Sequence, residues 1–236
     1  MAAAVGSLLP ALVFGVGFAN FFAGIPVKPA EPAGHMVDGS AMWAGSFLGL
    51  FTPFTLLGGV LLVALCITHG AVFLSLKTRG EIRTRARVFG VRAALVTAVL
   101  MAVFVLWANL AYVSGGVNST LTWIVGILSV AGLAAAWYSL QAGREGWSFI
   151  ATGVSIVTFA LMVFIKMFGN LGFANMDPAN PLNMATAASS NTTLFLMTIA
   201  AVIFVPIVIA YQAWSYWVFR RRISVKNLPV EVAPAS

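Results

Sequence analysis

Long apolar stretches alternate with short polar connectors along the chain, and this pattern predicts a bundle of membrane-spanning helices. A helix needs about 20 mostly apolar residues to cross the hydrocarbon core of a bilayer. About six stretches meet this requirement, over residues 2–23, 52–76, 88–113, 121–140, 147–168 and 193–219. We therefore expect an all-α fold, a polytopic membrane helical bundle that forms a single domain over residues 1–226. The polar residues 227–236 are expected to form a flexible cytoplasmic tail.

The composition supports lipid as the main solvent of the chain. Hydrophobic residues make up 61% of the sequence and charged residues only 8%, whereas a soluble domain carries roughly 25% charged residues. The net charge of +7 would suggest nucleic-acid binding in a soluble protein. Here the cations lie between apolar stretches, so we interpret them as topology signals and expect no nucleic-acid partner.

The distribution of cations predicts the orientation in the membrane. The connectors on one side carry the cationic segment Lys77–Arg92, Arg144, Arg220–Arg222 and Lys226, whereas Lys28 and Lys166 fall on the other side. The positive-inside rule places the cation-rich side in the cytoplasm. With six spans, both chain termini are then cytoplasmic.

Some polar and small residues within the spans are expected to serve helix packing. Gly15, Ala19 and Ala23 recur at four-residue spacing, which permits close contact between helices. Asn109 is expected to hydrogen-bond to a neighbouring helix. Trp214 lies among aromatic residues just before Arg220, where a headgroup-level anchor is the favoured interpretation.

His69 is the main candidate for intramembrane chemistry. Ionisable groups at membrane depth are functional candidates by default. The histidine could face a partner subunit, a quinone head or a water-filled cavity, hydrogen-bond a neighbouring backbone, or ligate a haem. We favour a structural role, because the residues around it form no recognisable ligand cluster. The acidic residues are all expected in loops or in the tail, so the chain looks poorly equipped for ion relay.

The cationic segment allows three interpretations: a topology determinant, an attraction to anionic lipid, or a docking surface for a partner. Within it, Lys77, Arg79 and Glu81 join His69 and Trp214 as candidates for structural or partner contacts. We assign no catalytic, cofactor-binding or metal-binding residue.

Three stretches carry a resemblance to a known family. They are "GSLLPALVFGVGFANFFAGIPV" at 6–27, "LFTPFTLLGGVLLVALCITHGAVFLSLKTRGEIRTRA" at 50–86 and "AASSNTTLFLMTIAAVIFVPIVIAYQAWSYWVFRRRI" at 187–223. The T-H-G-A followed by K-T-x-G-E is the most specific part. In this order the stretches resemble the C-terminal two-thirds of subunit II of cytochrome bd-type quinol oxidases.

The resemblance implies a subunit of a respiratory enzyme of the bacterial plasma membrane that oxidises a quinol, reduces dioxygen to water and contributes to the proton gradient. It implies that two haems b and one haem d are held by the partner, subunit I, which also binds the quinol. Subunit II packs against subunit I, carries no haem ligand, and can hold a structural quinone or lipid. A small single-helix subunit is a further expected partner.

The resemblance also predicts a missing part. The family has nine helices in this subunit, and its N-terminal three helices, with their G-F-D and W-D-G-N motifs, have no counterpart in this chain. A truncated gene model, a fragment or a split gene is the expected explanation. The alternative function, a small-solute transporter or channel, is motivated only by six helices with Gly and Pro interruptions.

Overall fold

The computed structural model describes residues 2–29, 41–113, 116–168, 171–175 and 188–219. The expected tail at 227–236 lies outside these residues. Within them the chain forms six long helices: α1 (Ala2–Ala23), α2 (Pro53–Lys77), α3 (Gly80–Tyr112), α4 (Gly116–Gln141), α5 (Glu145–Met167) and α6 (Asn191–Val218). All 6 are long and apolar enough to span a membrane. The predicted fold class, a polytopic helical bundle, is confirmed.

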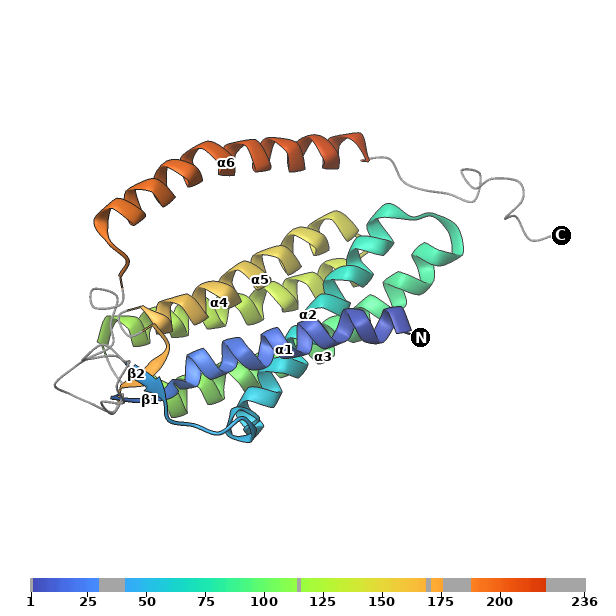
Figure 1. Ribbon diagram of the computed structural model, residues 1–236. Helices are drawn as coiled ribbons and strands as arrows, with labels where there is room; N and C mark the ends of the chain where they lie inside the picture. Colours follow the sequence, from blue (N-terminus) through green and yellow to red (C-terminus); the bar gives the residue numbers. More distant parts are fainter. Residues whose placement is uncertain (1, 30–40, 114–115, 169–170, 176–187, 220–236) are drawn as a thin grey trace.

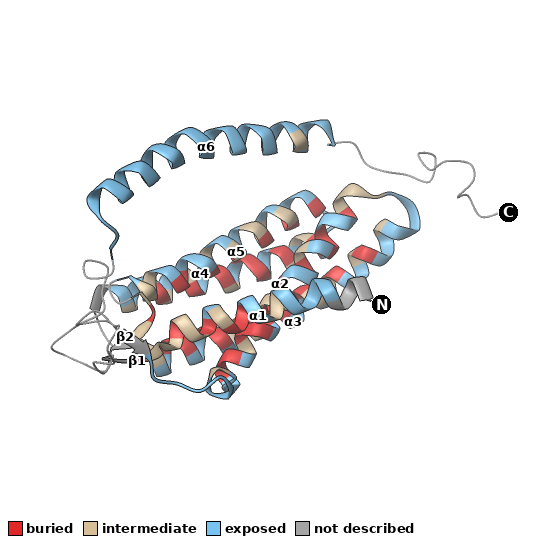
Figure 2. Ribbon diagram, in the orientation of Figure 1, coloured by how far each residue is buried: buried red, intermediate tan, exposed pale blue. Residues whose placement is uncertain are grey.

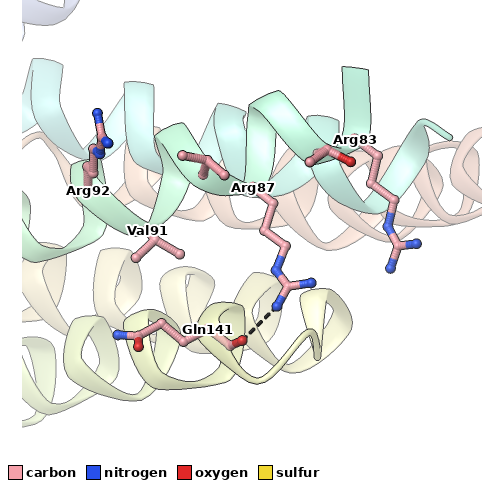
Figure 3. A pocket seen from close by; sticks show the side chains of 7 residues that line it. Arg83, Arg87, Val91, Arg92 and Gln141 are labelled. Carbon is pink, nitrogen blue, oxygen red and sulfur yellow. Dashed lines mark hydrogen bonds between the residues drawn. The ribbon is translucent and has the colours of Figure 1, made fainter. Parts of the chain in front are cut away.

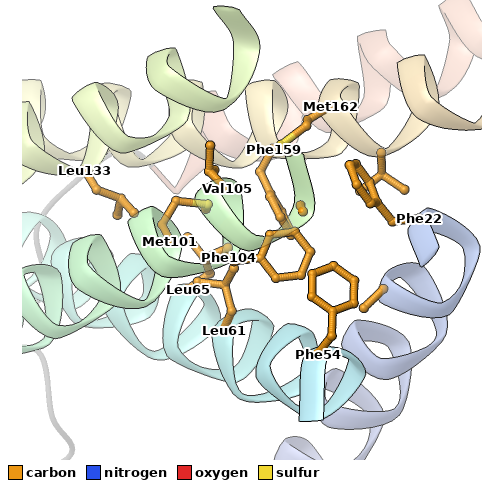
Figure 4. Packing of buried hydrophobic residues seen from close by; sticks show 13 residues of the cluster. Phe22, Phe54, Leu61, Leu65, Met101, Phe104, Val105, Leu133, Phe159 and Met162 are labelled. Carbon is orange, nitrogen blue, oxygen red and sulfur yellow. The ribbon is translucent and has the colours of Figure 1, made fainter. Parts of the chain in front are cut away.

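Helices α1 to α5 pack side by side into one bundle (Figure 1). Phenylalanine rings and aliphatic side chains fill its core (Figure 4). Phe54 of α2 stacks on Phe104 of α3 with ring centroids 4.9 Å apart, and Phe22 of α1 meets Phe104 edge-on at 6.2 Å. Such ring pairs add to the stabilisation that comes from burial alone. The core therefore ties α1, α2 and α3 together near one end of the bundle.

Small residues let α1 and α2 approach closely, as their spacing predicts. A Cβ atom added at Gly15 would lie 2.5 Å from the carbonyl oxygen of Gly58, and one added at Gly58 would lie 2.5 Å from the Cβ of Ala19. Ala19 is only 2% exposed. In lipid, helices associate through such backbone proximity because apolar burial alone gives no preference for protein over lipid.

Helix α6 lies apart from the five-helix bundle. It runs along the outside of α4 and α5 (Figure 1), and none of its apolar window is buried (Figure 2). Phe204 and Tyr211, for example, are 63% and 61% exposed. Just after the helix, the carbonyl oxygen of Phe219 accepts a hydrogen bond of 3.3 Å from Lys77 Nζ.

A small sheet, absent from the sequence-based expectation, closes one end of the bundle. Its strands are β1 (Ile25–Pro29), β2 (Ala41–Trp43) and β3 (Phe173–Asn175), in the order β2-β1-β3. β1 pairs antiparallel with β2 and parallel with β3. A 3-10 turn at Leu48–Leu50 leads from this sheet end into α2, where Thr52 accepts a hydrogen bond from the Thr55 amide as the N-cap.

The cationic segment is helical rather than a loop. Helix α3 begins at Gly80, whereas the apolar pattern places its start at Val88. Only Thr78 and Arg79 separate α2 from α3, and Gly80 adopts φ +67°, a backbone conformation that L side chains rarely adopt. Hydropathy marks where the lipid begins, and a helix that extends into the headgroup layer keeps its hydrogen bonds beyond that point. Residues 77–87, which the predicted spans leave between the two helices, are therefore mostly helical.

Candidate functional site

The end of the bundle opposite the sheet brings two separate connectors together, and we call it the basic end. It contains the end of α2, the start of α3, the end of α4 and the start of α5 (Figure 1). Contacts between side chains and backbone join these elements. The cations that the sequence assigns to one side of the membrane, from Lys77 to Arg92 and at Arg144, thus lie at one end of the described bundle.

An ion pair joins α3 to α5 at the basic end. Arg83 Nη2 lies 2.7 Å from Glu145 Oε1, and Arg83 Nε donates to the same oxygen at 2.9 Å. Glu145 occupies the first turn of α5 and is 4% exposed. A carboxylate there also interacts favourably with the positive end of the helix dipole. The buried acid is therefore compensated twice, by Arg83 and by its own helix.

The expectation that every acid lies in a loop or in the tail was wrong for two residues. Glu81 lies in the first turn of α3, and Glu145 in the first turn of α5. Their helices begin before the apolar pattern does, so polar residues that look like connectors occupy helical turns. The other four acids, Glu31, Asp38, Asp177 and Glu231, lie outside the described residues.

Arg87 caps the end of α4. Its Nε donates to the carbonyl oxygen of Leu140 at 2.8 Å, and its Nη2 donates to that of Gln141 at 2.6 Å (Figure 3). The last carbonyl groups of a helix have no partner within that helix. A cation is also favoured at this negative end of the helix dipole. Arg87 therefore fixes the position of α3 against α4. Because its partners are neutral carbonyl groups, its positive charge is not neutralised by them.

The candidates Lys77, Arg79 and Glu81 lie close together along the chain but make different contacts. Lys77, in the last turn of α2, donates to Phe219 as described above. Arg79 is the exposed N-cap residue of α3 and makes no side-chain cap bond. Glu81 forms an exposed ion pair with Arg85, one turn further along α3. Such exposed pairs contribute little to stability.

His69 contacts α5 rather than the candidates at the basic end. Its Nδ1 lies 2.8 Å from Thr152 Oγ1, and its ring stacks on Phe149 with centroids 4.7 Å apart. Thr152 also donates to the carbonyl oxygen of Phe149 at 2.9 Å. Because the Thr152 hydroxyl donates to Phe149, its oxygen is left to accept a hydrogen bond from His69. Both bonds therefore form together when Nδ1 of His69 carries the proton. Nε2 is then the nitrogen that can accept a hydrogen bond.

Hydroxyl groups that the sequence reasoning missed line the buried face of α5. Ser155 Oγ donates to the carbonyl oxygen of Ser129 on α4 at 2.7 Å, and Ser129 Oγ donates back to that of Ser155 at 2.9 Å. Ser148 Oγ donates to the carbonyl oxygen of Ala136 at 2.9 Å. The recurrence of small hydroxyl residues every three or four positions in α5 was the available signal. These groups bind backbone and leave no continuous acid–base chain in the described helices.

Asn109 makes the contact to a neighbouring helix that its position predicts. It is 3% exposed on α3 and accepts a hydrogen bond of 2.8 Å from Thr122 Oγ1 on α4. Trp214, by contrast, is 60% exposed on α6, and its ring lies 6.3 Å from that of Tyr211. The structure thus places His69 half-buried against α5, the three basic-end candidates together, and Trp214 on a separate helix.

No group of three or more His, Cys, Asp or Glu residues that could hold a metal ion occurs in the described part of the chain. Comparison with known proteins then identifies the family. The family model described as "Cytochrome bd terminal oxidase subunit II" matches residues 1–219.

Similar curated proteins carry related names. "Cytochrome bd ubiquinol oxidase subunit 2" of Bacillus subtilis is 31% identical over 94% of this chain and 63% of the relative. "Cytochrome bd-I ubiquinol oxidase subunit 2" of Escherichia coli K12 is 28% identical over 95% and 65%. "Probable cytochrome oxidase subunit 2" of Haemophilus influenzae is 31% identical over 89% and 62%.

The chain therefore spans less than two thirds of the length of each of these relatives. Within that span, the match is continuous from α1 to the end of α6. The six helices and the family together indicate a multi-pass bacterial membrane protein. The chain belongs to the cytochrome bd terminal oxidase subunit II family.

Proposed function

We propose that this chain acts as subunit II of a cytochrome bd-type quinol:oxygen oxidoreductase in the respiratory chain. The complex would oxidise a membrane quinol, reduce dioxygen to water and contribute to the proton gradient. The family match over residues 1–219 carries this proposal. The names of the similar proteins, which include ubiquinol oxidase subunits, support it.

Within the complex, the chain packs against subunit I and stabilises it. Two haems b and one haem d belong to subunit I in this proposal, and His69 serves a structural contact with Thr152. The uncovered α6 supports an assembly role, because none of its apolar window is buried in this chain, which leaves apolar surface for other helices. The proposed contacts to subunit I at the cytoplasmic side are made by Lys77, Arg79 and Trp214.

The proposed orientation places the basic end, and with it the C-terminus, in the cytoplasm of a bacterial plasma membrane. Clustering of cations at one end of the bundle supports this by the positive-inside rule. Lipid, a structural quinone and a small single-helix subunit remain proposed partners. The alternative of a solute transporter or channel has no support from the family match.

Capture of the complex tests the proposal. The chain is tagged after Ser236, expressed together with its neighbouring genes, and purified in a mild detergent. The eluate is analysed by gel electrophoresis and by a reduced-minus-oxidised spectrum. We expect a second large subunit in a fixed ratio, together with haem b and haem d bands and quinol-dependent oxygen uptake.

A matched preparation carries the coding region together with its upstream sequence. Haem that co-purifies with either preparation supports assembly with subunit I. A colourless eluate from both, with the tagged chain intact and monodisperse, would overturn the proposal. Solute uptake into liposomes by the purified chain alone would favour the transporter alternative instead.

A further inference from the structure

A hollow of about 470 Å³ opens between the start of α3 and the end of α4. Three arginines of α3 line it, and Figure 3 shows Arg83 and Arg92 to either side of Arg87 along this helix. Val88 and Val91 form apolar parts of the same wall, and Gln141 closes it from α4. The hollow thus combines several cations with an apolar lining.

The positive charge of the hollow is only partly neutralised by the described residues. Arg83 shares the carboxylate of Glu145. Arg87 donates to two neutral carbonyl groups, so its charge has no counterion there. Arg92 is exposed and makes no hydrogen bond or ion pair to the described part of the chain. Glu81, the other described acid near this end, is already bound by Arg85. The uncompensated charges of Arg87 and Arg92 therefore favour the binding of an anion in the hollow.

The depth of the arginines matches the boundary of a bilayer. From Arg92 to the end of α3 at Tyr112 there are about 20 residues, which rise roughly 30 Å and equal the thickness of the hydrocarbon core. Arg92 then lies at the edge of the hydrocarbon, while Arg83 and Arg87 lie further out, in the headgroup layer. The exposed Val88 lies between these two levels, where an acyl chain would begin.

We propose that this hollow binds the phosphate group of an anionic phospholipid from the cytoplasmic leaflet. Guanidinium groups match phosphate oxygens in charge and geometry. A free phosphate would use the arginines but would leave the apolar wall of Val88 and Val91 without a partner, which favours a lipid as the source of the phosphate. The inference depends on the membrane placement of α3 and not on the proposed oxidase function.

Native mass spectrometry of the full chain, together with the subunits that co-purify, tests the proposal. The purified protein is titrated with dioleoylphosphatidylglycerol, with dioleoylphosphatidylcholine as the zwitterionic comparison and inorganic phosphate as the soluble competitor. The main variant is Arg92→Gln, because Arg92 is exposed and makes no hydrogen bond or ion pair to the described residues. The matched control is Arg144→Gln, which removes the same charge at an exposed position outside the hollow.

We expect the unmodified protein to retain phosphatidylglycerol in preference to phosphatidylcholine. Arg92→Gln should weaken retention about fivefold, the size expected for one cation–lipid contact at a membrane surface. Arg92→Lys should restore most of it, and Arg144→Gln should leave it unchanged. Equal retention of the lipid by Arg92→Gln and Arg144→Gln would overturn the proposed site. Full displacement of the lipid by millimolar inorganic phosphate would show that the arginines bind a soluble anion, and it would overturn the proposal of a lipid ligand.

Discussion

Glu145 and Arg83 form an ion pair across the basic end, with Oε1 and Nη2 2.7 Å apart, although the residues are separated by 62 positions in sequence. The side chain of Glu145 is 5% exposed and that of Arg83 is 39% exposed. The pair connects the first turn of α5 to the second turn of α3. It is therefore a contact on which the arrangement of the two helices depends.

Removal of the carboxylate should destabilise the bundle. Glu145→Gln leaves Arg83 without its counterion, and the partial exposure of Arg83 limits the loss to about 1–2 kcal/mol. Thermal unfolding in a mild detergent, followed by intrinsic tryptophan fluorescence, should show a midpoint lower by a few degrees. Glu81→Gln is the matched control, since Glu81 belongs to an exposed pair. Equal effects of both variants would contradict the structural role of the buried pair.

The glycine contact between α1 and α2 gives a second prediction. Gly15→Ala places a Cβ atom 2.5 Å from the Gly58 carbonyl oxygen, so the two helices must move apart. Overpacking of this kind typically costs about 1–3 kcal/mol, and the unfolding midpoint should fall accordingly. Gly17→Ala, on the same helix, meets nothing within 4 Å and should leave the midpoint unchanged or raise it slightly. A stable Gly15→Ala protein would show that the close approach is not required.

The contact between His69 and Thr152 should affect assembly rather than turnover. In Thr152→Val, His69 Nδ1 loses its partner inside the membrane, and the yield of assembled complex should fall about two- to fivefold. Oxygen uptake per haem d in the surviving complex should stay the same. Thr158→Val is the control, because Thr158 bonds only to carbonyl groups of α5 in the described contacts. Normal yield with lost turnover would instead give His69 a functional role.

The reciprocal serine bonds predict coupling between α4 and α5. Ser129→Ala and Ser155→Ala each remove one of two hydrogen bonds that cross between the helices. A double-mutant cycle on the unfolding free energy should give a coupling of about 0.6 kcal/mol, the average for such contacts in a membrane protein. Additive effects within error would mean that the two hydroxyl groups act independently.

Labelling with a membrane-impermeant maleimide tests the orientation. In a Cys66→Ala background, which removes the single cysteine of the chain, cysteines are introduced at Thr78 at the basic end and at Ser46 near the sheet end. Ser46 is exposed in the structure, as is required for labelling. Spheroplasts should label Ser46→Cys alone, and inverted vesicles should label Thr78→Cys alone. The opposite result would reverse the proposed topology.

Sequence reasoning predicted the helices well because lipid imposes a simple requirement on their composition. The run from Pro53 to Lys77, for example, is apolar at nearly every position and can be recognised without knowledge of its neighbours. The start of α3 was missed for the opposite reason. Residues 80–87 are polar, and only the continuation of the backbone hydrogen bonds makes them helical.

The contacts of the site depend on tertiary geometry that a single sequence does not contain. Nothing local distinguishes Arg83, which pairs with Glu145, from Arg85, which pairs with Glu81 on its own helix. Predicted topology does place the cationic segment and Arg144 on one side of the membrane. This shared side was the one signal that α3 and α5 could be in contact there. It could not show which arginine pairs with which glutamate.

The short connection of α2 to α3 has a consequence for biogenesis. Since only Thr78 and Arg79 lie between these helices, the two form a tight hairpin. Helices α4 and α5, joined through residues 142–144, form a second hairpin of the same kind. Arg83 belongs to the first hairpin and Glu145 to the second. Their ion pair can form only after both hairpins have inserted, which makes it a late event in the synthesis of the bundle.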